Sequence, residues 1–72
     1  MALKLELSDE ALLVEIMRAL ARNGCLIRRI GPTVCWVVYP RASDAREAWL
    51  EVGFFIRAWQ AHHPGVEALL SL

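Results

Sequence analysis

The stretch LKLELSDEALLVEIMRALARNG, residues 3–24, contains the signals that decide the fold. Its first five residues alternate leucine with charged side chains, which is the period-two pattern of a strand with one apolar face. Ser8 and Asp9 follow, and we expect Ser8 to cap a helix that runs to about Asn23. Apolar residues recur along one side of this helix, and Gly24 can end it.

The same order of elements recurs in the second half of the chain. Residues 25–30 and 33–39 are rich in β-branched and aromatic residues, and a turn between them predicts a hairpin. Ser43 and Asp44 then begin a second helix, with Asp44 expected as its cap and with Glu47 three residues later. We expect this helix to run to about residue 62, where a Pro-Gly pair follows.

Two β-α-β units in series predict an α+β fold with the order β-α-β-β-α-β. This is the ferredoxin-like split βαβ arrangement, an antiparallel sheet with two helices on one face. The tail, residues 66–72, is short and apolar, so the alternative is β-α-β-β-α with a helical C-terminal tail. In either case residues 1–72 are expected to form a single small domain.

The two cysteines, Cys25 and Cys35, lie on the two strands of the predicted hairpin. A tight turn at Gly31 and Pro32 would place Cys35 opposite Arg28, so the cysteines would not face each other. They do not form a CxxC motif, and we therefore expect two free, buried thiols without redox or metal chemistry.

Composition and charge restrict the class of protein. The chain has 72 residues, 57% of them apolar, and a formal net charge of zero. A chain this short buries roughly 60% of its unfolded surface, so the apolar excess indicates a subunit interface. Nucleic acid is not the expected partner, because binders usually carry a basic excess. With no signal peptide and no stretch of about 20 apolar residues, we expect a cytoplasmic protein without membrane contact.

Few side chains suggest catalysis or metal binding. His62 and His63 are adjacent, so on a helix they point in different directions, and a third ligand is missing. No phosphate loop or Ser-His-Asp set occurs. We expect neither an enzyme nor a bound metal or cofactor. Arg28 and Arg29, near the hairpin tip, would face opposite sides of the sheet, and they are the residues that a nucleic-acid contact would use.

The second helix has two apolar sides. Ala48, Trp49 and Val52 belong to the side expected to face the sheet, with Trp49 as a core anchor. A glycine within the helix, Gly53, costs roughly 1 kcal/mol relative to alanine and often marks the close approach of another backbone. The opposite side is the predicted protein interface, formed by Leu50, Gly53, Phe54, Arg57 and Ala61. The alternative is that the C-terminal segment folds back over Phe54.

These features predict a small, non-enzymatic interaction or regulatory protein that forms a homodimer and acts by binding another macromolecule. A phage- or plasmid-type accessory factor is one form that such a protein takes. One alternative is a sensor domain that holds a small molecule on an apolar sheet face. The other is a nucleic-acid binder that uses its arginines. No motif identifies the partner protein.

Overall fold

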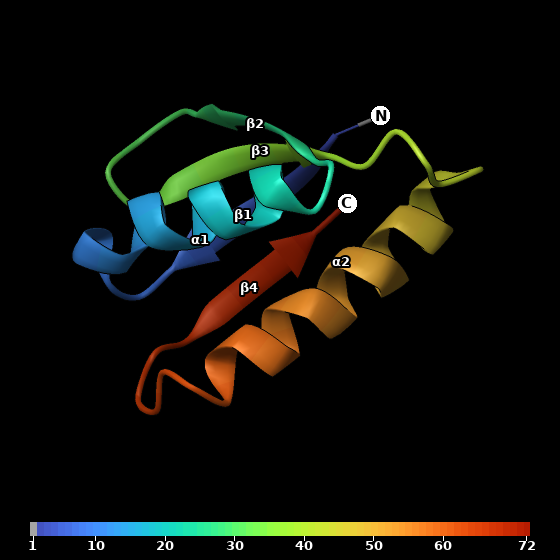
Figure 1. Ribbon diagram of the computed structural model, residues 1–72. Helices are drawn as coiled ribbons and strands as arrows, with labels where there is room; N and C mark the ends of the chain where they lie inside the picture. Colours follow the sequence, from blue (N-terminus) through green and yellow to red (C-terminus); the bar gives the residue numbers. More distant parts are fainter. Residues whose placement is uncertain (1) are drawn as a thin grey trace.

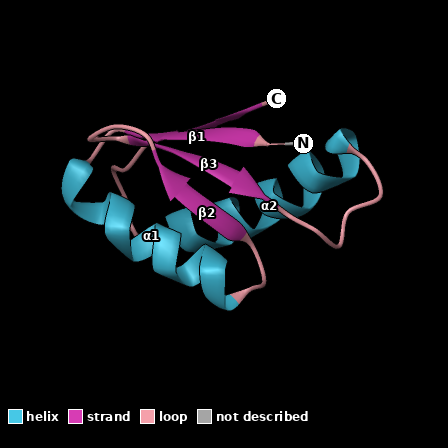
Figure 2. Ribbon diagram, turned by 90° about the horizontal axis from the view of Figure 1, so that it is seen from above, coloured by secondary structure: helices cyan, strands magenta, loops and turns pink. Residues whose placement is uncertain are grey.

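The computed structural model describes residues 2–72 as a four-stranded antiparallel sheet with both helices on one face (Figures 1 and 2). The strand order is β2-β3-β1-β4. In chain order the elements are β1 (Leu3–Leu7), α1 (Glu10–Arg22), β2 (Leu26–Arg29), β3 (Val34–Val38), α2 (Ala45–Gln60) and β4 (Ala68–Ser71). The predicted ferredoxin-like α+β fold is confirmed, and the alternative of a helical tail is wrong, because the tail forms β4. Met1 of the predicted domain lies outside the described residues.

Strand β1 organises the sheet because it pairs with both β3 and β4. Its leucines are buried, whereas Lys4 and Glu6 are exposed. The alternation seen in the sequence therefore separates a face covered by the helices from an open face. The core between sheet and helices contains side chains from every element except β2 and β4, whose apolar residues pack at its margin. Its largest fully buried members are Leu3, Leu5, Leu13, Ile16, Leu20, Val37 and Cys35.

The caps of the two helices differ in how well the sequence predicted them. Asp44 caps α2 as expected, and its side chain accepts a hydrogen bond of 2.8 Å from the Glu47 N–H. The predicted cap of α1 is wrong. Asp9, and not Ser8, is the N-cap, and its side chain accepts a hydrogen bond from the Ala11 N–H. Ser8 pairs with Glu67 at the end of the sheet. Its N–H donates to the Glu67 carbonyl and its hydroxyl accepts from the Glu67 N–H, which extends the β1–β4 ladder by one residue.

The register of the β2–β3 hairpin differs by one residue from the predicted one. Arg29, rather than Arg28, lies opposite Cys35, and Arg28 lies opposite Trp36. The turn is longer than a tight Gly-Pro turn, because two successive N–H groups, those of residues 30 and 31, both donate to the Val34 carbonyl. A shift of one residue moves side chains to the other face. Arg28 is therefore on the open face of the sheet.

Both cysteines are free and buried in the core. Burial raises the pKa of the Cys25 thiol, and it raises that of Cys35 to about 11. Because the thiolate is the reactive form of cysteine, both groups are poor nucleophiles in the folded protein. Their contribution is to packing.

Candidate functional site

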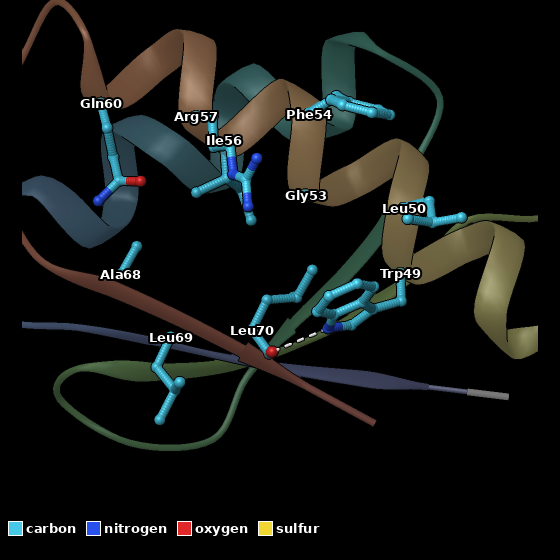
Figure 3. Close-up of a pocket in the computed structure, with 10 residues that line it drawn as sticks. All are labelled: Trp49, Leu50, Gly53, Phe54, Ile56, Arg57, Gln60, Ala68, Leu69 and Leu70. Atoms are coloured by element: carbon cyan, nitrogen blue, oxygen red, sulfur yellow. Dashed lines mark hydrogen bonds between the residues drawn. The ribbon is translucent and has the colours of Figure 1, made fainter.

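A groove of about 280 Å³ runs between α2 and the edge strand β4 (Figure 3). Its walls are mostly apolar. One wall is a side of α2. The other is β4, which lies in the tail that the sequence predicted as either a strand or a helix. The groove is lined by Trp49, Leu50, Gly53, Phe54, Ile56, Arg57, Gln60, Ala68, Leu69 and Leu70. Four of the five residues predicted to form an interface thus line one continuous surface. The fifth, Ala61, is the exposed C-cap of α2 and is not among the lining residues.

Trp49 is not the core anchor that the helical periodicity predicted. Its side chain is 39% exposed, whereas Ala48, Val52 and Ile56 form the buried stripe of α2. Trp49 lies on the flank of that stripe, at the sheet edge, where only the short strand β4 is beneath it. The indole Nε1 donates a 3.0 Å hydrogen bond to the Leu70 carbonyl (Figure 3). Trp49 is therefore an end wall of the groove.

Gln60 marks the other end of the groove. Its side-chain amide Nε2 donates a 3.1 Å hydrogen bond to the carbonyl of Val66, just before β4. Figure 3 shows Gln60 and Trp49 at opposite ends of the helix segment above the strand. These two hydrogen bonds hold α2 against β4 over the length of the groove. The sequence offered no signal for either bond, because both acceptors are backbone carbonyls in the undecided tail.

Phe54 and Leu50 form an apolar crest on the solvent-facing side of α2. The Phe54 side chain is 64% exposed and that of Leu50 is 42% exposed. Phe54 borders the groove on one side and a second hollow on the other, which lies toward the end of α1 and is lined in part by Asn23 and Phe55. The C-terminal segment does not cover Phe54, because it forms β4 within the sheet. The apolar crest is open to a partner on both sides.

Gly53 lies beside Phe54 on the groove side of the helix. A Cβ atom placed on Gly53 would meet no atom within 4 Å. The packing of this chain therefore does not require glycine at this position, although glycine weakens the helix. The open space above Gly53 is available to a group from outside the chain.

Charges lie on both sides of the crest. Arg46 and Arg57 fall on the edge toward β4, and Glu47 and Glu51 fall on the edge toward α1. All four side chains are exposed. Within residues 2–72 none of them takes part in an ion pair. An apolar crest between a cationic and an anionic edge has the composition of a protein interface with a polar rim.

The two arginines near the hairpin tip are separated, as predicted, onto the two faces of the sheet. Arg29 donates to the carbonyls of Gly31 and Pro32 and lies 3.9 Å from Glu10. It is thus held within its own chain. Arg28 is exposed on the open face, next to Trp36.

The C-terminal end of α2 contains a histidine contact that the sequence did not reveal. The His63 ring stacks on the Trp59 ring at 3.9 Å. Its two nitrogens lie 2.9 Å from the Trp59 carbonyl and 3.0 Å from a carboxylate oxygen of Glu15 on α1. The hydrogen bond to the Trp59 carbonyl raises the pKa of His63, and Glu15 adds to this effect. Residues 2–72 contain no cluster of potential metal ligands around it.

Comparison with known proteins returned no match to a family model, to a curated protein or to a solved structure. None of the helices between residues 2 and 72 is long and apolar enough to cross a membrane.

Proposed function

We propose that this protein is a small, non-enzymatic interaction protein that self-associates through the α2 crest and the α2–β4 groove. The observation that carries the proposal is the continuity of this surface. An exposed aromatic crest, a groove and an unoccupied space above Gly53 adjoin one another along α2. Contiguous apolar surface of this kind marks an interaction site on a small protein.

Self-association is favoured over a foreign partner by the charges at the rim. In a two-fold dimer whose α2 helices run in the same direction, the arginine edge of one helix faces the glutamate edge of the other, as in parallel coiled coils. Arg57 of one chain would then approach Glu51 of its partner. Both edges exist on the same chain, so the surface is complementary to a second copy of itself. The exposed Phe54 ring would lie near the two-fold axis.

Sedimentation equilibrium at micromolar concentration tests the proposal. We expect the parent protein to be a dimer and Phe54→Glu to be a folded monomer, since two carboxylates would meet near the centre of the interface. Leu26→Glu is the matched control, because Leu26 is 63% exposed, almost as much as Phe54, but lies on β2. It should remain a dimer.

A charge exchange tests the orientation of the helices. Arg57→Glu should weaken the dimer, and adding Glu51→Arg in the same chain should restore it, because the pair is then reversed across the interface. A monomeric parent protein, or a Phe54→Glu variant that sediments as the parent does, would contradict self-association through α2. Failure of the double variant to recover would contradict the parallel arrangement alone.

A further inference from the structure

The open face of the sheet carries a row of three side chains that the corrected hairpin register reveals. Lys4 on β1 and Arg28 on β2 both lie directly opposite Trp36 on β3. Directly paired residues of neighbouring strands project from the same face. Trp36 is therefore flanked by one cation on each side, and its side chain is 38% exposed.

The surroundings of Trp36 are shallow and apolar. A hollow on this face is lined by Trp36, Arg28 and the side chains of Ala2, Leu26 and Val38. Apart from Arg28, the side chains that line this hollow are apolar, so a planar group can approach the indole from there. The hollow lies on the opposite side of the sheet from α2, so it is independent of the proposed dimer surface.

The charges of the row are available to a ligand. Within residues 2–72 neither Lys4 nor Arg28 takes part in an ion pair. The acid nearest to Trp36 on this face is Glu6, which lies two residues from Lys4 on β1, opposite Val34 and Leu69. Around Trp36 the cations therefore outnumber the anion, although the chain as a whole is neutral.

We propose that the open sheet face binds a short segment of single-stranded nucleic acid, with one base stacked on Trp36 and the flanking phosphates on Lys4 and Arg28. Aromatic side chains on an exposed sheet stack on unpaired bases, and cations beside them hold the backbone. The two cations are two strand spacings apart, about 9.5 Å. That separation suits two phosphates on either side of one base better than the single phosphate of a mononucleotide.

Fluorescence anisotropy with fluorescein-labelled oligothymidylate and oligouridylate, titrated at several salt concentrations, tests this site. Two phosphate contacts predict a slope of log K against log salt of about −1.4, from about 0.7 per phosphate on a single strand. Arg28→Gln should reduce the slope to about −0.7. Trp36→Ala should weaken binding by about tenfold or more, whereas Trp36→Phe, which keeps a ring, should retain most of the affinity.

Arg18→Gln is the control, since Arg18 is exposed on α1 and lies away from the open face. It should leave affinity and slope unchanged, and circular dichroism should show that every variant is folded. The proposal is overturned if neither oligonucleotide binds, if Trp36→Ala binds as the parent does, or if Arg18→Gln lowers the slope as much as Arg28→Gln. Equal binding of uridine monophosphate or of a polyglutamate peptide would also overturn it, because the site would then not select a strand.

Discussion

The two helices cover the same face of the sheet, yet the side chains on their solvent-facing sides differ. Helix α1 buries Leu13, Ile16 and Leu20 and exposes a back that carries Glu15, Arg18 and Arg22. Helix α2 buries a narrower stripe of smaller residues and exposes the Phe54 crest. Helix α1 has the pattern of an amphipathic helix whose main apolar stripe is buried against its own sheet. Helix α2 has more apolar surface than its own chain can cover.

The comparison indicates a division of roles within a very small molecule. The core of a chain of this size supplies only about 3–5 kcal/mol of stability, and α1 with β1 and β3 supplies its most deeply buried side chains. Substitutions on α1 should therefore act on folding, while those on the outer side of α2 should act on association. Four measurements can break or sharpen this distinction.

The largest effect is expected for Leu13→Ala in α1. Leu13 is fully buried, so its truncation should lower the free energy of unfolding by about 3 kcal/mol through lost burial and a residual cavity. Urea denaturation followed by circular dichroism should show that the variant unfolds at a much lower urea concentration than the parent protein. Val14→Ala, at a neighbouring position that is 40% exposed, is the control and should change stability by less than about 1 kcal/mol. Similar losses at both positions would remove the distinction between the two sides of α1.

Trp49→Ala should have an intermediate effect, about 2 kcal/mol, because Trp49 is only partly buried and loses one hydrogen bond to Leu70. Trp49→Phe keeps an aromatic ring but lacks the donor, so it should account for about 1 kcal/mol of that loss. Both values come from urea denaturation. A loss of 4 kcal/mol or more in Trp49→Ala would mean that Trp49 is a core residue after all and that α2 is rotated relative to the sheet.

Gly53→Ala should have opposite effects on folding and on association. In the monomeric Phe54→Glu background it should stabilise the fold by roughly 0.5–1 kcal/mol, because alanine favours the helix and its Cβ meets no atom. In the parent background it should weaken the dimer, because the added methyl group occupies the space offered to the partner. Denaturation and sedimentation measure the two effects separately. A variant that associates as tightly as the parent would show that this space stays empty in the dimer.

The smallest effect expected is a pH dependence of stability, which arises from the contact between His63, after α2, and Glu15 on α1. Both nitrogens of His63 face acceptors, the Trp59 carbonyl and the Glu15 carboxylate, so the protonated ring is favoured in the folded protein. The pKa of His63 is thus raised above its ordinary value of 6.5. The resulting stabilisation is fully present below pH 6.5 and is lost as the pH rises through the folded pKa. Thermal denaturation across this range should show the decline.

Glu15→Gln should make that decline shallower, since one of the acceptors loses its charge, whereas His62→Gln at the exposed neighbour should preserve it. A decline that is unchanged in His63→Gln would assign the pH dependence to another group. This measurement is the one that tests a contact between α1 and α2 directly.

Local patterns were sufficient for much of the fold. The alternation of β1 and the Asp44–Glu47 cap depend on neighbours in the chain, and both were predicted. The α1 cap was not, because either Ser8 or Asp9 can cap a helix, and the choice depended on Glu67, which is distant in the sequence and precedes β4. The hairpin register failed for a related reason. It depends on how the turn shares one carbonyl between two N–H groups, which composition does not specify.

The candidate site also contains residues that the sequence placed correctly and residues that it did not. The helical period was sufficient to place Leu50 and Phe54 on one side of α2, and both are exposed. It could not place Trp49, because an angle on a helix does not tell how far the sheet extends beneath it. The strand wall of the groove depends on the identity of the tail. The row around Trp36 depends on a register that is known only once the strands are paired.

The hydrogen bonds from α2 to the carbonyls of Leu70 and Val66 have a consequence for solubility. The Leu7 N–H donates toward β3, so the backbone groups of Ala68 opposite it point away from the sheet, and those of Leu70 follow the same alternation. A strand from another molecule could add to such an edge and begin a polymer. The indole of Trp49 already occupies one of the acceptors that an incoming strand would need. Trp49, which bounds the groove, therefore hinders the addition of another strand to β4, the first step of fibril growth.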